Sequence, residues 1–269
     1  MISEMVPERL KPKADLEKEI LNRADPRFYL SIFFAAVWGF LPDARATYSI
    51  LGFDPETGEI GGAVQSCVPT VTMVLHGRGE VGMLAVQGRA RPGYGADGLS
   101  YLRTGMAPRE VIETVHREGF LFTPWGGNKF EMQFAVMDRR GETAAYTGPQ
   151  CQDYAGHLQG RFCIAQGNLV ANARVVSAMV RAFEATPGAL KYRLMAALDA
   201  AQANGGDRRG MMSAAMVIVK NGLRENDGKV LELESNMNFF PLADLRRQLD
   251  SPRPVSQSTR ESAPLRRPK

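Results

Sequence analysis

The chain has 269 residues, of which 44% are hydrophobic and 23% charged, proportions typical of a soluble globular protein with one sizeable domain, or at most two. The net charge is +4, but residues 251–269 contribute all of it, with five basic residues and one acidic residue. The rest is neutral, which argues against nucleic-acid binding, because a phosphate-binding surface needs clustered basic residues on the folded domain. Since residues 251–269 are also rich in Pro and Ser, we expect a disordered basic tail there.

The cysteines and histidines show no pattern typical of a metal site or a disulfide framework. The three cysteines have no C-x-x-C spacing, and the three histidines include no H-E-x-x-H pair. Neither a phosphate-binding nor a dinucleotide-binding glycine motif is present. We therefore expect no metal and no other cofactor, and we interpret the cysteines as small, partly buried thiols.

Residues 1–46 are interpreted as a leader. Residues 1–27 are polar and charged, whereas Phe28–Leu41 is an uncharged apolar run of 14 residues. Such a run is shorter than the roughly 20 residues of a transmembrane helix, but it is typical of the apolar region of a signal peptide. The A-x-A sequence Ala44-Arg45-Ala46 follows, and cleavage after it would expose Thr47. We expect a periplasmic or secreted protein whose only membrane contact is through the leader. The long acidic start leaves open a docking extension and a cytoplasmic location.

Residues 47–250 alternate between segments that favour strands and segments that favour helices. The expected strands are Thr47–Phe53, Ile60–Gln65, Val71–Leu75, Val81–Gln87, Met132–Met137, Thr143–Tyr146, Arg161–Gln166, Ser213–Val219 and Lys229–Leu233. Two helices should follow the glycine-rich loop 91–95, the second from Pro108, and three more should cover Ala173–Glu184, Leu190–Ala203 and Pro241–Leu249. This order predicts an α+β domain, in which two stacked, mostly antiparallel sheets between two helix layers would bury every apolar face.

Several motifs in this domain resemble those of one bacterial family. They are T-Y-S-I-L-G-F-D-P-E-T-G-E (47–59), G-G-A-V-Q-S (61–66), R-P-G-Y-G-A-D-G-L (91–99), T-G-P-Q-C (147–151), A-G-H (155–157), Q-G-N (166–168) and G-G-D-R-R-G (205–210). Together they resemble the family known as domain of unknown function 1028, which is regarded as similar to the N-terminal-nucleophile (Ntn) hydrolases. The resemblance implies the four-layer αββα sandwich of that group. It favours hydrolysis of an amide or peptide-like C–N bond in a small molecule.

Thr47, at the start of the first expected strand, is the predicted nucleophile. A Thr hydroxyl needs a base to take its proton, and the α-amine of a chain end, with a typical pKa of about 7.7–8.0, can be that base. While Ala46 is attached, the nitrogen of Thr47 is an amide without useful basicity. Removal of residues 1–46 would therefore activate the site. The alternative is that Thr47 merely starts a strand.

Other polar residues in glycine-bearing loops could complete such a site. Asn168 is the first candidate for a donor to the oxyanion, although it could instead cap the next helix, and Ser66 could relay a proton. The substrate-binding or orienting candidates are Ser49, on the same strand face as Thr47, the backbone N–H of Gly148, and an ion pair between Asp207 and Arg208. That ion pair could equally be structural.

The sequence departs from the family pattern in two places. Gln65-Ser66-Cys67 stands where the family often has A-S-K, so a lysine is missing, and the family's acidic, histidine-containing segment appears as the uncharged Ser235–Asn238. Two alternatives therefore stay open. The chain could be a non-catalytic, ligand-binding or structural member of the same fold, or Cys67 could be the nucleophile. In each case we expect a homo-oligomer.

Overall fold

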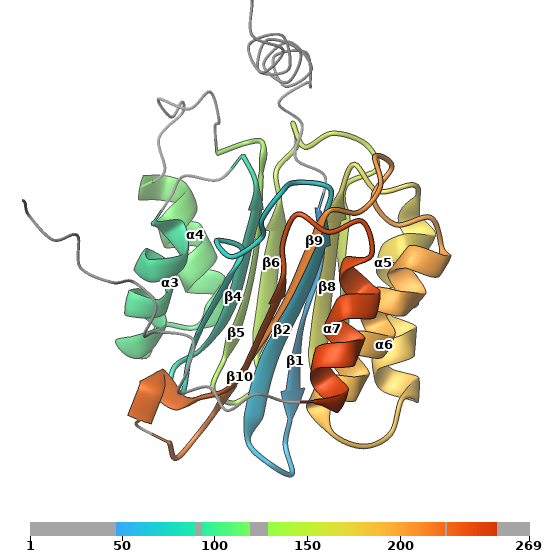
Figure 1. The fold of residues 1–269 in the computed structure, drawn as a ribbon. Helices are drawn as coiled ribbons and strands as arrows, with labels where there is room; N and C mark the ends of the chain where they lie inside the picture. Colours follow the sequence, from blue (N-terminus) through green and yellow to red (C-terminus); the bar gives the residue numbers. More distant parts are fainter. Residues whose placement is uncertain (1–46, 90–92, 119–128, 224, 252–269) are drawn as a thin grey trace, which may run out of the picture. The chain divides into compact units, whose positions relative to one another are not determined.

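The computed structural model describes residues 47–89, 93–118, 129–223 and 225–251. The expected leader at 1–46 lies outside the described residues, as does the expected tail at 251–269 apart from Ser251. Two antiparallel sheets are stacked on each other, and five α-helices are present among the described residues (Figure 1). The expected α+β class with two antiparallel sheets is confirmed.

The larger sheet has six strands, in the order β10-β9-β2-β1-β8-β7, and every neighbouring pair is antiparallel. Its strands are β1 (Thr47–Asp54), β2 (Glu59–Ser66), β7 (Gly156–Gly160), β8 (Cys163–Asn168), β9 (Ser213–Lys220) and β10 (Lys229–Ser235). β1 is central and buried along its whole length. A short 3-10 helix, η1 (Glu225–Gly228), precedes β10.

The smaller sheet has four strands, in the order β3-β4-β5-β6, again all antiparallel. They are β3 (Leu75–Arg78), β4 (Gly82–Gly88), β5 (Met132–Asp138) and β6 (Thr143–Thr147). The two sheets pack face to face through a cluster of buried apolar residues from both, which includes Leu51, Val64, Met83, Ala135 and Met137.

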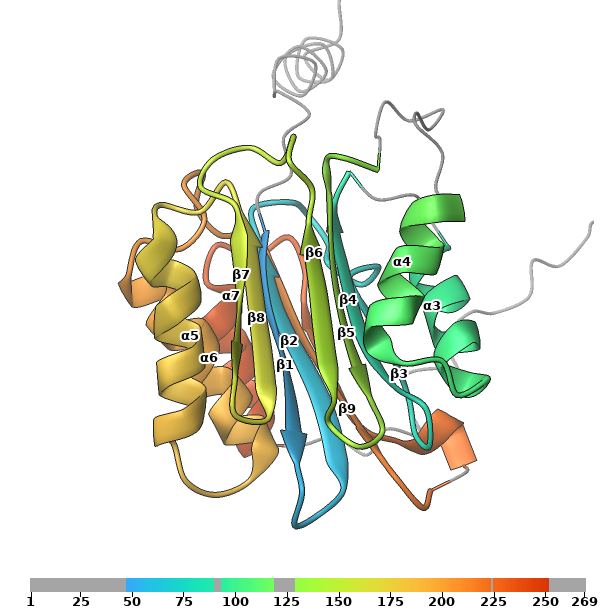
Figure 2. The ribbon, with the colours of Figure 1, turned by 180° about the vertical axis from the view of Figure 1, so that it is seen from behind.

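The helices cover the outer face of each sheet (Figures 1 and 2). Helices α5 (Ala173–Ala185), α6 (Leu190–Ala203) and α7 (Pro241–Asp250) pack on the larger sheet. Helices α3 (Tyr94–Arg103) and α4 (Pro108–Glu118) pack on the smaller one. Each sheet therefore buries both faces, which explains why its central strands have almost continuous apolar sequences.

Alternation along β1 shows how the sequence assigns the two faces. Tyr48 and Ile50 join the apolar cluster under α5 and α6, whereas Leu51 and Phe53 join the cluster between the sheets, because successive strand side chains point to opposite faces. Gly52 lies under α5, where an added Cβ would be 2.4 Å from Cε2 of Phe183. Glycine at this position lets the helix approach the strand closely.

The local structure departs at three points from what the sequence suggested. Val71–Leu75 is not a strand: the backbone turns there, with the N–H of Val74 donating to the carbonyl of Val71 at 2.9 Å, and β3 begins only at Leu75. The edge strand β7 was not predicted, because its sequence G-H-L-Q-G has little apolar character. Helix α5 is capped by Asn172, whose side chain accepts from the N–H of Arg174, whereas Asn168 is a strand residue.

Candidate functional site

A row of four buried polar side chains crosses one end of the larger sheet. It consists of Asn168, Thr47, Ser66 and Ser213, and each is directly opposite the next in the strand register. Directly opposed residues of antiparallel strands carry their side chains on the same face, with Cβ atoms about 4.5–5.5 Å apart. The row is at most 4% exposed. Thr47 therefore lies between Ser66 and Asn168, and its hydroxyl donates to Oγ of Ser66 at 3.1 Å.

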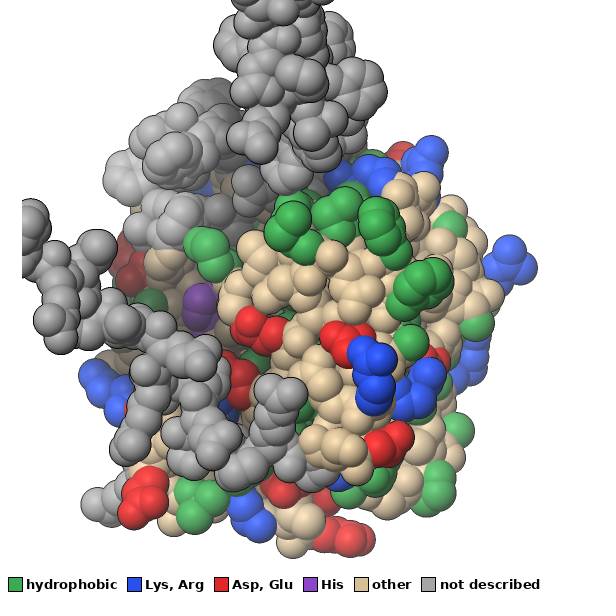
Figure 3. Space-filling model, in the orientation of Figure 1, with side chains coloured by type: hydrophobic (Ala, Val, Ile, Leu, Met, Phe, Trp, Pro, Cys, Tyr) green, Lys and Arg blue, Asp and Glu red, His purple; other side chains and the backbone are tan. Residues whose placement is uncertain are grey.

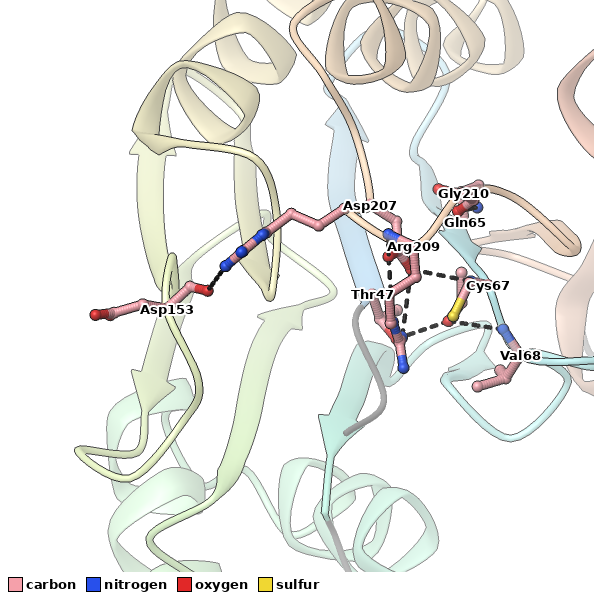
Figure 4. A network of polar contacts seen from close by, with 10 residues as sticks. Thr47, Gln65, Cys67, Val68, Asp153, Asp207, Arg209 and Gly210 are labelled. Carbon is pink, nitrogen blue, oxygen red and sulfur yellow. Dashed lines mark hydrogen bonds and ion pairs between the residues drawn. The ribbon is translucent and has the colours of Figure 1, made fainter. Parts of the chain in front are cut away.

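A loop after α6 brings a buried carboxylate to this row. Asp207 forms an isolated bridge with Val170, and its side chain is 0% exposed. Its Oδ2 accepts from the N–H of Cys67 at 3.0 Å, while its Oδ1 accepts from the N–H of Arg209 at 2.9 Å and faces Nε of Arg209 at 3.4 Å. Figure 4 shows Thr47, Cys67, Asp207 and Arg209 gathered together. The carboxylate thus joins the end of β2 to the glycine-bearing loop.

Arg208 does not form the expected ion pair with Asp207. Its Nη1 donates to the backbone carbonyl of Asp153 at 3.1 Å, and Asp153 lies well away from Thr47 in Figure 4. Arg209 is the partner of Asp207 instead. The reason is local: the tight turn at 207–209 folds the main chain and side chain of Arg209 back onto the carboxylate.

Beneath the row, side-chain amides connect the two sheets. Gln87 of β4 donates from Nε2 to the carbonyl oxygen of Thr47 at 3.0 Å and to Oε1 of Gln133 at 2.8 Å. Its own Oε1 accepts from the hydroxyl of Ser49 at 2.7 Å. Nε2 of Gln166 donates to the carbonyl of Ala85 at 3.0 Å. Ser49 is fully buried and its hydroxyl is bonded to Gln87 of the other sheet, so its expected role in orienting a substrate stays a prediction.

Gln133 of β5 fixes the orientation of these amides. Its Nε2 donates to the carbonyls of Gly167 at 2.8 Å and Gly156 at 3.2 Å, and a carbonyl can only accept. Its Oε1 must therefore face the other way, where it accepts from the amide nitrogens of Gln87 and of Asn168, both at 2.8 Å. The side-chain amide of Asn168 is thereby set with its NH₂ group toward Gln133.

Asn168 also lines a shallow pocket between the ends of β4, β5 and β8. The other lining residues are Gly88, Arg89, Glu131, Gln150, Cys151, Gln152 and Leu169. An ion pair between Nη1 of Arg89 and Oε2 of Glu131, at 3.1 Å, belongs to this lining. Side chains of both charges therefore line this pocket beside the row.

Gly148 has its backbone N–H, an expected donor to the oxyanion, already engaged in a hydrogen bond. Its N–H donates to the carbonyl of Met132 at 3.0 Å and so continues the pairing of β5 and β6. The A-G-H motif contributes in another way, because Nδ1 of His157 is 2.9 Å from Oγ1 of Thr147, which accepts from Gln133. Burial lowers the pKa of His157, which favours the neutral imidazole near pH 7.

The environment of Cys67 does not favour a nucleophilic thiol. Burial, reinforced by the nearby Asp207 carboxylate, raises the pKa of Cys67 to about 11. The thiolate is the nucleophilic form of cysteine, and it is a very small fraction of the thiol at neutral pH. Thr47 therefore remains the better candidate.

Sequence reasoning missed Arg209 and the three buried glutamines Gln87, Gln133 and Gln166. A signal was available for the glutamines, because each follows or interrupts an apolar strand sequence: A-V-Q-G, M-Q-F-A and I-A-Q-G. A glutamine in the middle of such a run must be buried, and a buried amide must find hydrogen-bond partners. For Arg209 there was no such signal, since Arg208 beside it is an identical residue.

No group of three or more potential metal ligands is present within the described ranges. In the same part of the chain, no helix is long and apolar enough to span a membrane.

Together, the fold and the row of polar residues define an α+β domain with two antiparallel sheets and a threonine at the first position of its central strand. The chain matches the profile of a family described as "Family of unknown function (DUF1028)" over residues 47–257, and it belongs to this family. A crystal structure of a DUF1028 protein from Silicibacter pomeroyi is similar to it, with 32% identity and a TM-score of 0.66, over 77% of this chain and 85% of that chain. The search of curated proteins gives no match.

Proposed function

We propose that the domain is a four-layer sandwich of the Ntn-hydrolase type and that it hydrolyses a C–N bond in a small amide or peptide-like substrate. Thr47 is the nucleophile after removal of residues 1–46. Export would carry out that removal and place the protein in the periplasm or outside the cell. The observation that carries the proposal is the position of Thr47, with Ser66 on one side and Asn168 on the other, all three on one face of the sheet.

After removal of residues 1–46, Thr47 would be the new chain end and would have to stay in place. Its surroundings suit this requirement. Its carbonyl accepts from Gln87 of the other sheet, and its hydroxyl donates to Ser66. Strand pairing with β2 and β8 holds it on both sides. A new chain end would otherwise fray, as termini do unless they are tied down. These contacts keep the nucleophile ordered without the leader.

The proposed reaction uses the new α-amine as its base. The hydroxyl proton of Thr47 passes to the amine, directly or through Oγ of Ser66, while Oγ1 attacks the substrate carbonyl carbon. The tetrahedral intermediate collapses with loss of the amine product, which takes the proton. Water then attacks the acyl ester by the same route, releasing the acid and restoring the hydroxyl. Every step is a proton transfer or an acyl transfer, so the reaction needs no further reactant.

Asn168 is the proposed donor to the oxyanion. One N–H of its amide donates to Gln133, and we assign its second N–H to a substrate oxygen in the adjoining pocket. Removing one such donor from an amide-hydrolysing site typically costs about 10²–10³ in kcat. The contact with Gln133 sets the position of the donor before the substrate arrives.

The test combines intact mass with covalent labelling. Protein from an exporting host should lack residues 1–46, and a β-lactone, which acylates a nucleophilic hydroxyl by ring opening, should add its mass to the peptide that begins with Thr47. Thr47→Ala should remove the label, while Thr47→Ser should keep it. Thr57→Ala is a matched control, because Thr57 is an exposed residue in the turn at the other end of β1.

A non-catalytic, ligand-binding protein is the second candidate, because Gln65-Ser66-Cys67 brings no lysine to the row. Labelling of Thr47→Ala at the wild-type rate, or a cut chain that resists the lactone, would refute the hydrolase and leave the ligand-binding protein. Loss of the label with iodoacetamide, together with a label on Cys67, would move the nucleophile to the cysteine.

A further inference from the structure

An apolar patch lies between β10 and α7. It consists of Met237, Phe239 and Phe240, which are 75%, 75% and 72% exposed. Figure 3 shows hydrophobic side chains gathered on this part of the surface. Isolated exposed apolar residues are ordinary, but three such large side chains within four positions make a contiguous patch, which on a soluble protein is often a binding surface.

The chain holds this patch in a defined shape. The N–H of Met237 donates to the carbonyl of Pro69 at 2.9 Å, and that of Asn238 donates to the carbonyl of Met212 at 2.8 Å. The side chain of Asn238 accepts from the N–H of Phe240 at 2.9 Å and donates to Ser235 at 3.0 Å. Met237 adopts a left-handed backbone conformation, with φ of 49°, which is unfavourable for a residue with a long side chain. The aromatic rings are thus presented outward by a structured segment.

We propose that this patch is the contact through which two copies of the chain form a symmetric dimer. The charge balance supports this occupant, because residues 47–250 carry 21 basic and 21 acidic residues, so no net repulsion opposes the approach of an identical domain. In a two-fold dimer the same patch meets itself, and aromatic rings pair well with aromatic rings.

The exposed area of the patch is enough for the apolar centre of such a dimer, though not for the whole interface. An aromatic side chain buries about 150–250 Å², so three side chains that are about three quarters exposed present roughly 400 Å² per copy. Two copies together would bury roughly 800 Å² in the patch alone, and a small stable interface buries about 1,200 Å². The polar rim around the patch must supply the remaining third. This inference does not depend on the role of Thr47.

The experiment compares the mass in solution of the full chain and of two sets of variants. The wild type should sediment as a dimer at micromolar concentration, and Phe239→Ser with Phe240→Ser should weaken the dimer at least tenfold in Kd. The control is Leu158→Ser with Tyr192→Ser, which changes two hydrophobic residues that are 42% and 46% exposed in β7 and α6. The control should remain a dimer. All chains carry the same residues 1–46, so any association through them is common to all.

Phe240 directly precedes α7, so the double variant could also disturb that helix. Phe239→Ser alone avoids the helix boundary and should still weaken the dimer, with an unchanged thermal midpoint of the dilute protein. A bismaleimide should also cross-link Phe239→Cys to itself and leave Leu158→Cys uncross-linked. A monomeric wild type, or a dimer equally stable in the Phe239 variants and the control, would overturn the proposal.

Discussion

The two ends of β1 differ sharply in what fills the space between the sheets. At the Asp54 end, Leu51 and Phe53 join a purely apolar cluster. At the Thr47 end, the same face of the same strand carries Thr47 and Ser49, which meet the amide network of the opposite sheet. One strand thus packs through apolar contact at one end and through directional hydrogen bonds at the other.

The comparison shows that the fold replaces apolar packing with hydrogen bonds at the end of β1 where side chains are held in fixed positions. Apolar contact is favourable in many arrangements, so it tolerates small shifts, whereas a buried amide is stable only with its partners in place. Gln133 holds five partners: Gln87, Asn168, Thr147 and the carbonyls of Gly156 and Gly167. A network of this kind specifies a single arrangement of the row containing Thr47. Such precision is useful at an active site and unnecessary at the other end of the strand.

Replacing Gln133 with Leu should have the largest effect. The substitution keeps the volume but leaves several buried polar groups without partners, each of which costs about 1–3 kcal/mol. We expect a loss of roughly 3–5 kcal/mol in the free energy of unfolding, measured by urea denaturation, because more than one group is left unpaired. Lactone labelling of the folded fraction of the cut protein should also fall at least tenfold.

Leu51→Ala provides the matched change at the apolar end. Leu51 is fully buried, and truncation of such a residue costs about 2–5 kcal/mol. The loss of stability should therefore be similar, but labelling of Thr47 in the folded protein should hardly change. If both variants reduced labelling equally, the amide network would be ordinary structural support.

Gly52→Ala tests the packing of α5 against the apolar end of β1. The added methyl group would lie 2.4 Å from the ring of Phe183, and overpacking of this kind costs about 1–3 kcal/mol. Phe183→Leu makes room, so the double variant should be more stable than the sum of the two single changes implies. Thermal or urea unfolding of the four proteins gives the coupling, and strict additivity would show that α5 simply moves away from β1.

Cys67 offers a test of the charges near Thr47. Because the pKa of Cys67 is raised to about 11, the thiolate fraction and the alkylation rate should rise about tenfold per pH unit between pH 8 and pH 10. Asp207→Asn removes a carboxylate that raises this pKa, so alkylation at pH 8 should become several times faster. Peptide mass spectrometry after iodoacetamide treatment measures the rate at Cys67, and Asp199→Asn is a control carboxylate in α6. A rate already level at pH 8 would contradict the raised pKa.

The sequence was sufficient for the fold class and for most strands and helices, because alternating or continuous apolar runs mark buried strands. It failed where the apolar pattern is weak or misleading: the edge strand β7 is polar, and Val71–Leu75 is apolar yet turns. For the site, the expected strands ended at Gln65 and Gln166, just short of Ser66 and Asn168, so the sequence placed these two residues near Thr47 but not directly opposite it. The preference of Asp207 for Arg209 over Arg208 depends on a single turn, and the bonds between glutamines of the two sheets depend on how the sheets pack. Neither is encoded in local sequence.

Replacing Asn168 or Asn172 with Ala should give the smallest change in stability of these variants. The pair separates a residue that positions the site from one that only stabilises a helix. The side chain of Asn172 caps α5 by accepting from the N–H of Arg174 at 2.9 Å, and loss of a cap costs about 1 kcal/mol. Asn168→Ala removes one donor from Oε1 of Gln133, which still accepts from Gln87, so its cost should also be about 1 kcal/mol.

Stability therefore should not distinguish the two variants, but lactone labelling of the cut protein should. Asn168→Ala should slow acylation of Thr47 about 10²-fold if its amide binds the oxyanion, while Asn172→Ala should leave the rate unchanged. Equal rates in the two variants would remove Asn168 from the site and leave it as a residue that joins the sheets.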